Sequence, residues 1–331
     1  MKDLLSIVRL NKFFPLPKTS LFQRQRPVLR ANDDISLVVR EGETFGLVGE
    51  SGSGKSTLGR CLLQLTKPTS GQVVYHGEKE GFTPRYLQTK KMEENRQTTG
   101  AGIDLTRLSA KEMRLLRKDL QIVFQDPYSS LNPRMTVGQI LEEGVAIHTP
   151  YKKGTRQMQE YVLKVMEECG LQAHMLHRYP HQFSGGQRQR ICIARALAVK
   201  PKFVVCDECV SALDVSIQAQ ILNLLSDLKE REKLTYLFIS HDLSVVRYIS
   251  DRIAVMYLGK IVELGETEQI FQNPCHPYTQ TLLAALPSYS TKRESIASFT
   301  LQKYQGKDVQ RVPVPMIEVE KGHLVRMDFE K

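Results

Sequence analysis

The sequence is poor in the features that mark secreted, membrane-spanning and disulfide-stabilised proteins. Its 331 residues contain six cysteines at irregular spacing, which is not the pattern of a disulfide framework. The first residues, MKDLLSIVRLNKFFP, lack a long apolar run followed by a small-residue cleavage site, so we expect no secretory signal. Apolar runs such as IAVMYLG are only strand-length, far short of the roughly 20 residues that cross a bilayer. We therefore expect a protein of a reducing, cytoplasmic compartment that does not cross a membrane by itself.

The charge is strongly basic, yet it lacks the pattern of a nucleic-acid-binding surface. The formal net charge is +10, with 41% hydrophobic and 25% charged residues, which is ordinary for a globular protein that buries a core. Basic residues gather near the N-terminus and around 85–96, but aromatic side chains are not interleaved with them as in base-stacking surfaces. We therefore expect no nucleic-acid partner.

The stretch VVCDECVSALD at 204–214 holds a Cys-x-x-Cys pair around two adjacent carboxylates. Such a pair can hold a metal or cycle as a dithiol, whereas Asp207 and Glu208 at the end of an apolar strand can hold magnesium and position water. Cys206 ends the apolar run that begins at Phe203, so it is expected to be a core residue with an inert thiol. Cys209 follows the strand, and no second cysteine pair lies nearby. The acids are therefore expected to carry the chemistry.

An earlier segment, residues 43–65, predicts a phosphate-binding loop. An apolar strand is followed by GESGSGKS at 49–56 and then by apolar residues at helical spacing, which fits the pattern G-x-x-x-x-G-K-[ST]. The glycines let successive N–H groups point at phosphate oxygens, Lys55 would bridge the β- and γ-phosphates, and the Ser56 hydroxyl would bind Mg²⁺. The predicted nucleotide-binding residues of this segment are Gly49, Ser51, Gly52, Ser53, Gly54, Lys55, Ser56 and Thr57.

Three further stretches predict helices, and polar residues stand beside two of them. LSAKEMRLLRKDL predicts a helix capped by Ser109 and Glu112, and Gln125 follows the next short apolar strand. Residues 138–177 have helical periodicity and predict a separate helical subdomain. Ser184-Gly185-Gly186 then opens a long helix, a setting suited to an anion.

YLFISHDLSVV is another apolar strand, and it ends in a polar trio. His241 stands at the end of this strand, where ligand-binding residues of α/β proteins gather. Asp242 is expected to cap the helix that follows.

Taken together, these motifs resemble the ATP-binding subunits of ABC transporters over roughly residues 4–287. The resemblance rests on their order along the chain, and the motifs are 49–56, Gln125, FSGGQ at 183–187, FVVCD at 203–207 with Glu208, SALD at 211–214, and His241. DPYSSLNPRMTVGQI, DVSIQAQILNLL and NPCHPYTQTLLAALP are similar to the oligopeptide, dipeptide and nickel importer branch, most of all to its oligopeptide-type second ATPase subunit.

The resemblance implies an α/β fold: a P-loop NTPase core of the ABC type, a small antiparallel β-subdomain and an inserted α-helical subdomain. We expect an ATPase domain over 1–287, with core and β-subdomain at about 1–126 and 196–265, the helical signature subdomain at about 127–195, and a C-terminal extension at 288–331. The segment near 78–101 resembles an insertion in the β-subdomain, more simply a tolerated loop than a partner contact.

The resemblance also implies roles for individual residues. Glu208, His241 and Gln125 would be catalytic, and Ser56, Gln125 and Asp207 would hold Mg²⁺. An aromatic residue, Phe14 or alternatively Phe13, would stack on adenine. The signature residues Ser184, Gly185, Gly186 and Gln187 would bind ATP held by the other ATPase subunit of a head-to-tail pair.

As a whole, the resemblance implies a Mg-dependent ATPase that energises import of oligopeptides or dipeptides. Its cofactors would be ATP and Mg²⁺, and it would lie peripherally on the cytoplasmic face of the cell membrane. Its partners would be a second ATPase subunit, two transmembrane permease subunits and an extracytoplasmic substrate-binding protein. Nickel is the alternative cargo. A soluble ABC ATPase acting on nucleic acid, on ribosomes or in an enzyme complex is the alternative function.

Two residues depart from the usual family pattern. Phe183 replaces the usual leucine of the signature, an apolar change of tolerable volume. Cys209 stands where proline usually follows the catalytic glutamate, which removes a constraint on φ beside Glu208. Beyond residue 288 the stretch RVPVPMIEVEKGHLVRMDFEK alternates in polarity, which predicts one or two strands or a docking tail.

Overall fold

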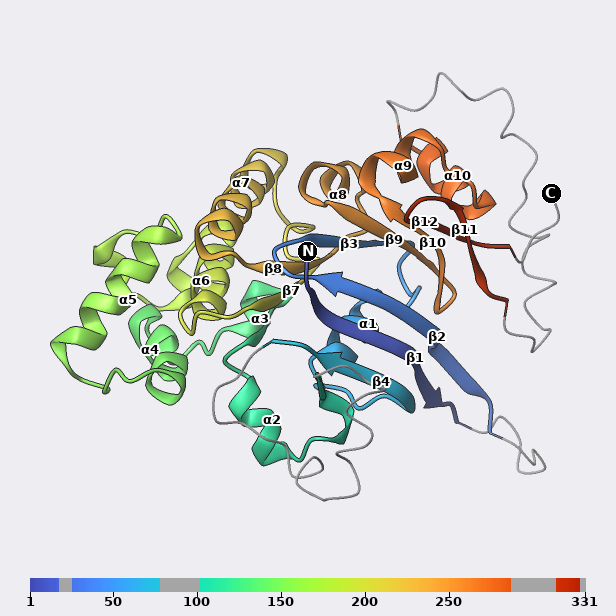
Figure 1. Cartoon of the computed structure of the whole chain (residues 1–331). Helices are drawn as coiled ribbons and strands as arrows, with labels where there is room; N and C mark the ends of the chain where they lie inside the picture. Colours follow the sequence, from blue (N-terminus) through green and yellow to red (C-terminus); the bar gives the residue numbers. More distant parts are fainter. Residues whose placement is uncertain (18–25, 78–101, 287–313, 328–331) are drawn as a thin grey trace. The chain divides into compact units, whose positions relative to one another are not determined.

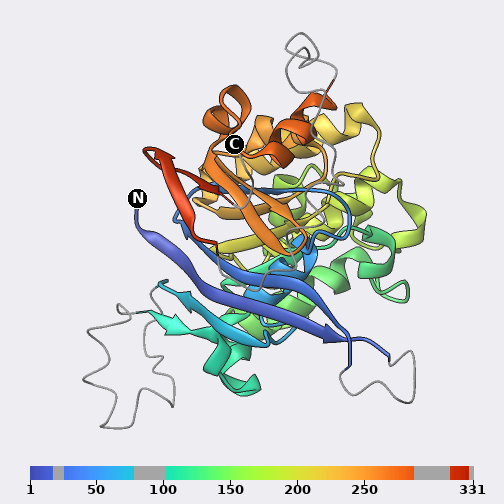
Figure 2. The ribbon, with the colours of Figure 1, turned by 90° about the vertical axis from the view of Figure 1, so that its right-hand side faces the viewer.

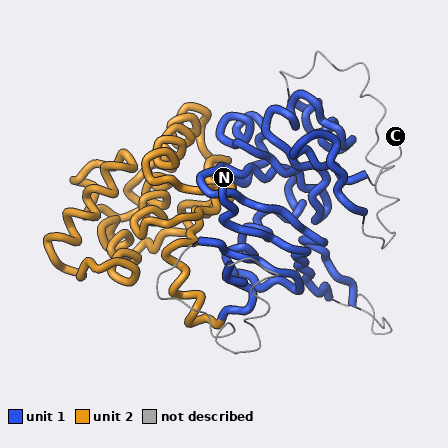
Figure 3. The backbone as a smooth tube through the Cα atoms, viewed as in Figure 1, with its two compact units in different colours: residues 1–108, 238–331 blue, residues 109–237 orange. Residues whose placement is uncertain are grey.

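The computed structural model describes residues 1–17, 26–77, 102–286 and 314–327, which form two compact units (Figure 3). Unit 1 comprises 1–108 and 238–331, and unit 2 comprises 109–237. The predicted insertion at 78–101 lies outside the described residues. The subdomain bounds expected from the sequence remain a prediction. Within the described ranges, no helix has both the length and the apolar character that crossing a bilayer requires.

Unit 1 contains an antiparallel sheet with strand order β2-β1-β4-β5 (Figure 1). In β2 the positions from Ile35 to Arg40 alternate between buried and more exposed, as expected for a sheet with one face on a core, whereas irregular pairing interrupts such an alternation in β1. The strands are β1 (Asp3–Pro15), β2 (Val28–Arg40), β4 (Ser70–Tyr75) and β5 (Ile103–Asp104).

A second sheet in unit 1 has the order β11-β12-β10-β9-β3. Every residue of β3 is buried, and β3 pairs in parallel with β9, which explains why its sequence TFGLV has no polar alternation. Figure 2 shows β11 and β12, in red, beside the orange strand β10, and β12 pairs antiparallel with β10. The strands are β3 (Thr44–Val48), β9 (Arg252–Tyr257), β10 (Lys260–Glu266), β11 (Met316–Glu320) and β12 (His323–Arg326).

The helices of unit 1 follow these strands along the chain. Asp242 caps α8 by accepting from the N–H groups of Ser244 and Val245, as predicted. Two strands form in the C-terminal stretch, which confirms the strand prediction there. The helices are α1 (Lys55–Leu62), α8 (Leu243–Ile249), α9 (Thr267–Gln272) and α10 (Pro277–Ala284), with a 3₁₀ turn at Leu105–Arg107.

Unit 2 combines parallel strands with a group of packed helices. β6 (Leu120–Val123) pairs in parallel with β7 (Phe203–Asp207), and β8 (Thr235–Ile239) carries the chain from unit 2 back into unit 1. The capping box of Ser109 and Glu112 forms at the start of α2, as predicted. The helices are α2 (Ala110–Leu116), α3 (Pro127–Ser130), α4 (Val137–His148), α5 (Arg156–Glu168), α6 (Gly185–Leu197) and α7 (Val215–Glu232), with 3₁₀ turns at Ala173–Met175 and Pro180–Gln182.

The helical region expected within 138–177 is confirmed as helices α4 and α5, which pack on each other and on α6. The apolar residues that predicted it are buried, so they form the core between these helices. They are Ile140, Leu141, Val145, Val162, Val165, Met166 and Leu171.

Candidate functional site

The predicted phosphate-binding loop joins β3 to α1 in unit 1, and its backbone carbonyl groups contact the side chain of Lys55. Lys55 is the first residue of α1, and its Nζ donates to the carbonyl oxygens of Gly49 and Glu50, at 2.8 Å each. Only 4% of Lys55 is exposed, so these carbonyl groups replace much of the water that the ammonium would otherwise bind. The loop is therefore folded around a positive charge, as a phosphate site requires.

Two positions of this loop require glycine because other backbone segments approach them closely. Gly49 has a φ of 146° and Gly54 a φ of 104°. A Cβ on Gly49 would overlap the carbonyl oxygen of Met256, and a Cβ on Gly54 would overlap that of Ala31. Gly54 is also the N-cap residue of α1, where backbone N–H groups face a potential anion.

The remaining predicted residues of the loop differ in exposure. Ser51 and Gly52 are exposed, whereas Ser53 is buried and its Oγ lies 3.5 Å from the Nζ of Lys55. Ser56 and Thr57 lie half-buried in the first turn of α1. Hydroxyl groups are therefore available both at the tip of the loop and at the start of the helix.

Two side chains that support the loop were missed by the sequence reasoning. Asn32, fully buried on β2, donates through Nδ2 to the carbonyl oxygen of Gly54 at 3.1 Å. Tyr278 on α10 accepts through its hydroxyl from the N–H of Glu50 at 3.0 Å. A lone asparagine in an alternating strand carries no local signal. The stretch NPCHPYT resembles the family, but nothing in its sequence indicates a contact with the loop.

The two candidate adenine-stacking residues are consecutive on β1, and each ring has a different basic side chain beside it. The ammonium of Lys12 lies 4.7 Å from the ring centroid of Phe14 and also donates to the carbonyl oxygen of Lys67, at 2.9 Å, just beyond α1. Phe13 instead lies under the guanidinium of Arg30, 5.3 Å from its ring centroid. Phe14 is 37% exposed, so part of the residue is accessible to solvent.

In unit 2 the ends of β6 and β7 bring two predicted catalytic residues together. The parallel register pairs Val123 with Cys206, so both strands end at one edge. Beyond that edge, Gln125 donates through Nε2 to Oε2 of Glu208 at 2.8 Å. Asp207, the last residue of β7, is buried, whereas Glu208 is half-buried. The carboxylate of Glu208 is therefore held by an amide from the neighbouring strand end.

The backbone at Glu208 adopts an uncommon conformation. Its φ is 48°, in the left-handed region that costs a residue other than glycine about 1–2 kcal/mol. The carbonyl oxygen of Glu208 accepts from the N–H of Ser211 at 3.2 Å and from its hydroxyl at 2.9 Å, which stabilises the turn. A proline at position 209 would disfavour a helical φ/ψ at the preceding residue, so Cys209 leaves the backbone of Glu208 less restricted.

The cysteines that flank the two acids are both buried. Cys206 lies on β7 and Cys209 beyond it, and both are almost fully buried. A hydrogen bond with Cys209, together with burial, raises the pKa of the Cys206 thiol well above its ordinary value. Because the thiolate is the reactive form, this environment favours an inert thiol. The expectation that Cys206 is a buried strand residue is confirmed.

The signature residues form the start of α6. Ser184 is the N-cap residue: its Oγ accepts from the N–H of Gln187 at 3.3 Å, while Oε1 of Gln187 accepts from the N–H of Ser184 at 3.1 Å. Ser184 and Gly185 are exposed, Gly186 is half-buried, and Phe183 packs inside. The capping box therefore fixes the loop while presenting its outer side to solvent.

His241 follows β8 in unit 1, and its position is fixed by the flanking residues. The N–H of Ser240 donates to the carbonyl oxygen of Leu47 on β3 at 3.2 Å, which sets the strand end beside the strand that leads into the phosphate-binding loop. Asp242, on the other side, caps α8. The side chain of His241 is exposed, where it can meet a ligand.

Two families have sequence patterns that match this chain in succession. The family described as "ABC transporter" matches residues 32–211, and the family described as "Oligopeptide/dipeptide transporter, C-terminal region" matches residues 262–311. The first match contains the phosphate-binding loop, Gln125, the signature and Glu208. The second contains α9, α10 and most of β10.

Curated relatives are similar over most of their length. The oligopeptide transport ATP-binding protein AppF of Bacillus subtilis is 46% identical over 300 residues, covering 89% of this chain and 83% of the relative. OppF of the same organism is 48% identical over 286 residues, covering 86% and 83%. The dipeptide transport ATP-binding protein DppF of Haemophilus influenzae is 48% identical over 295 residues, covering 88% and 81%.

Solved structures of ATP-binding cassettes share the fold. A dimer of the cassette MJ0796 in a post-hydrolysis state, bound to ADP and phosphate, matches with a TM-score of 0.65 and 25% identity, covering 80% of this chain and 99% of that chain. The protein cbiO1 of Clostridium perfringens, part of the complex cbiONQ, matches with a TM-score of 0.64 and 23% identity, covering 88% and 99%. The P-loop cassette fold expected from the sequence is confirmed.

Proposed function

This chain belongs to the ABC transporter family of ATP-binding subunits, and from that premise we propose that it hydrolyses ATP to drive peptide import through a permease formed by other chains. The observation that carries the peptide cargo is the succession of the two family matches along one chain, the cassette first and the peptide-transporter C-terminal region after it. The relatives named for oligopeptide and dipeptide transport support the same cargo.

Nucleotide binding is the first step that the residues of unit 1 would perform. The backbone N–H groups between Gly49 and Gly54 would donate to phosphate oxygens, and Lys55 would exchange carbonyl contacts within the loop for the β- and γ-phosphates. The buried charge of Lys55 and the two sterically required glycines support this fit. The exposed ring of Phe14 favours it over Phe13 as the residue that stacks on adenine.

Hydrolysis would use the residues at the ends of β6 and β7. Asp207 and Gln125 offer oxygen ligands of the kind that Mg²⁺ prefers, and Mg²⁺ would neutralise phosphate charge. Glu208 would accept the proton of the attacking water. The 2.8 Å contact from Gln125 fixes the orientation of that carboxylate, so a change in Gln125 would change how Glu208 holds water.

The other proposed roles concern the negative charge on the γ-phosphate during hydrolysis and the contact with a second ATPase subunit. His241 would donate to the γ-phosphate from the end of β8. Ser184, Gly185 and Gly186, exposed or half-buried at the start of α6, would bind the nucleotide held by a second ATPase subunit. A head-to-tail pair of cassettes follows from this arrangement, and the dimeric state of the similar cassette MJ0796 supports it.

The subunit would work peripherally at the cytoplasmic face of a membrane, with two permease subunits and an extracytoplasmic substrate-binding protein completing the system. The decisive experiment is isolation of the tagged chain from its native membranes, followed by identification of the co-purified chains and measurement of ATP-dependent peptide uptake in vesicles. We expect two polytopic membrane proteins and uptake that Lys55→Ala abolishes, because that variant loses the charge that binds phosphate. Uptake of nickel instead of peptide would correct the cargo, and recovery with ribosomes or a soluble enzyme complex would refute the proposal.

A further inference from the structure

One backbone N–H of the phosphate-binding loop is already used by a distant side chain. The N–H of Glu50 donates to the hydroxyl of Tyr278 at 3.0 Å, although the two residues are 228 positions apart in sequence. Both belong to unit 1, and Tyr278 lies on α10, in the region matched by the peptide-transporter C-terminal family. A side chain outside the loop therefore holds the loop at its second residue.

Tyr278 is itself held on two sides. Its ring packs on that of Tyr257, with centroids 4.2 Å apart, and only 2% of the residue is exposed. Its own N–H donates to Nδ1 of His276 at 3.1 Å. Burial raises the pKa of the Tyr278 hydroxyl, so the hydroxyl stays protonated and uncharged. It can therefore keep its hydrogen bond with the N–H of Glu50.

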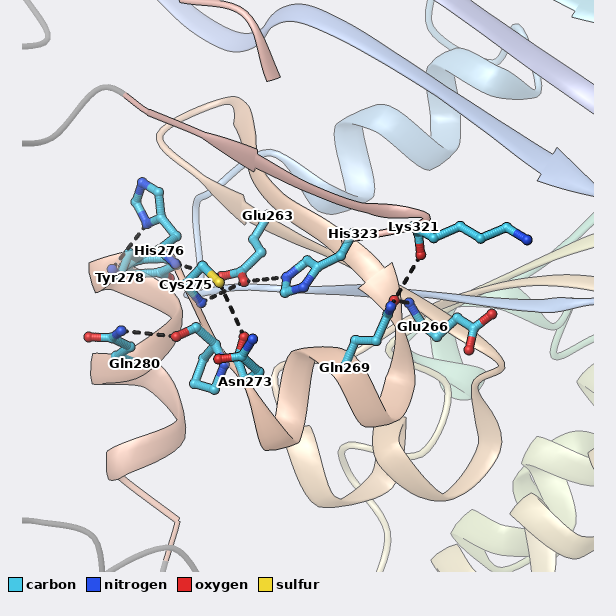
Figure 4. A network of polar contacts seen from close by, with 11 residues as sticks. Glu263, Glu266, Gln269, Asn273, Cys275, His276, Tyr278, Gln280, Lys321 and His323 are labelled. Atoms are coloured by element: carbon cyan, nitrogen blue, oxygen red, sulfur yellow. Dashed lines mark hydrogen bonds and ion pairs between the residues drawn. The ribbon is translucent and has the colours of Figure 1, made fainter. Parts of the chain in front are cut away.

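A buried carboxylate continues this network away from the loop (Figure 4). Glu263 on β10 accepts from the N–H of Cys275 at 2.8 Å and from the N–H of His276 at 3.0 Å. It also contacts Nε2 of His323 at 2.7 Å, and both side chains are completely buried. His323 belongs to β12, so the network reaches the C-terminal hairpin, which we define as β11 and β12.

A metal site would be a different interpretation of part of this network. Possible ligand atoms of Glu263, Cys275 and His323 lie within 4.8 Å of one another. Two ligands at tetrahedral angles on a zinc ion, each about 2.0–2.1 Å from it, would be separated by about 3.3 Å. The 2.7 Å contact of Glu263 with His323 is a hydrogen-bond distance instead, and the second carboxylate oxygen is engaged by His276. The geometry thus favours a hydrogen-bonded network around Glu263 over a metal site.

We propose that Tyr278 is a positioning residue of the phosphate-binding loop and that the C-terminal hairpin holds it in place through His323, Glu263 and His276. Within this network, the hairpin fixes Glu263, Glu263 fixes the start of α10, and α10 presents the hydroxyl of Tyr278 to Glu50. ATP affinity would then depend on residues of the C-terminal region. The proposal rests on the assignment of residues 49–56 as the ATP-binding loop.

The first test deletes one hydroxyl and measures the equilibrium affinity for Mg-ATP in the full chain. Tyr278→Phe keeps the ring on Tyr257 but leaves the N–H of Glu50 without its acceptor. We expect ATP binding to weaken about three- to tenfold, the usual effect of losing one neutral hydrogen bond. Hydrogen exchange at the Glu50 amide should become faster by a similar factor, because that amide is no longer protected.

Tyr161→Phe is the control, because it also removes a tyrosine hydroxyl that is hydrogen-bonded to the backbone: the Tyr161 hydroxyl donates to the carbonyl oxygen of Ala198 at 2.8 Å in unit 2. ATP affinity should not change in this control. An unchanged affinity in Tyr278→Phe, or an equal loss in both variants, would overturn the positioning role. Lys55→Ala is measured in parallel: if it binds ATP as the wild type does, the loop assignment has failed rather than the role of Tyr278.

The second test asks whether the hairpin acts through Tyr278. His323→Ala removes the contact with Glu263 and should weaken ATP binding in the presence of Tyr278, but should add nothing further in the Tyr278→Phe background. His323→Gln can supply an amide donor at the same place and should restore part of the affinity. Strictly additive effects would overturn the linkage. Stoichiometric zinc or iron that is lost in His323→Ala would instead establish the metal site.

Discussion

The sharpest prediction concerns Glu208→Gln, which separates ATP binding from ATP hydrolysis. Glutamine has nearly the same shape as glutamate, and its carbonyl oxygen can accept the hydrogen bond that Gln125 now donates to Oε2 at 2.8 Å. The strand end and the turn at this position should therefore persist. The substitution removes the negative charge, and with it the ability to take a proton from water.

The expected loss follows from that single change. A positioned general base contributes about 10²- to 10⁴-fold to a rate, which corresponds to roughly 2.7–5.4 kcal/mol of transition-state stabilisation. Mg-ATP affinity should stay within about threefold of the wild type, because binding relies on Lys55 and on the backbone of its loop. The variant should consequently accumulate as an ATP-bound pair of cassettes.

The assay is single-turnover hydrolysis of radiolabelled ATP in the assembled complex, with hydrolysis disabled at the partner's own site. Glu230→Gln is the control, since it removes an equal charge from an exposed position of α7 and should leave turnover unchanged. Hydrolysis by Glu208→Gln within about threefold of the wild type would refute the assignment of Glu208 as the base. A parallel loss of ATP affinity would mean that the substitution disturbs binding and would equally contradict the reasoning.

Three further predictions concern the buried cysteine before Asp207, the first glycine of the phosphate-binding loop and an exposed ion pair. Cys206→Ala should lower the free energy of unfolding by about 1 kcal/mol through a small cavity, with ATP turnover unchanged, as denaturant titration and an activity assay can check; loss of bound metal would contradict it. Gly49→Ala should reduce ATP affinity at least about tenfold, because its Cβ would overlap the carbonyl oxygen of Met256; titration with Mg-ATP tests this, and wild-type affinity would contradict it. A hydrogen bond from Arg247 lowers the pKa of Glu268 below 4.5, so this contact stabilises the fold above that pH and the stabilisation is lost as pH falls through the folded-state pKa. Glu268→Gln should therefore lower Tm near neutral pH, and this difference should shrink as the pH falls through the folded-state pKa of Glu268; a difference in Tm that does not change with pH would refute the linkage.

The motifs that the sequence identified are those whose geometry is set by neighbouring residues. Ser184 and Gln187 form a capping box because they stand three positions apart at the start of a helix. The strand of Cys206 is recognisable because a parallel strand buried on both faces has a continuous apolar sequence. The loop around Lys55 is recognisable because only glycine permits two of its close backbone approaches. In each case the signal lies within a few residues of the structure it predicts.

The contacts that support these motifs come from segments far apart in sequence, and no local pattern predicts them. Tyr278 reaches Glu50 across 228 positions, and His323 reaches Glu263 across 60. Tertiary packing decides such pairs, because both partners must first be placed by their own strands and helices. The left-handed backbone of Glu208 is likewise imposed by the surrounding turn, since propensity alone disfavours it.

The C-terminal hairpin also determines where the chain can be shortened. β12 covers the side of β10 away from β9, and β11 forms the outer edge with mostly exposed side chains. A version cut at residue 287 would leave the backbone groups of β10 unpaired and the carboxylate of Glu263 without His323. An uncovered strand edge can pair with another copy of itself, so such a version should self-associate. Versions intended for expression or crystallisation should therefore extend at least to Arg326, although the catalytic motifs end much earlier in the sequence.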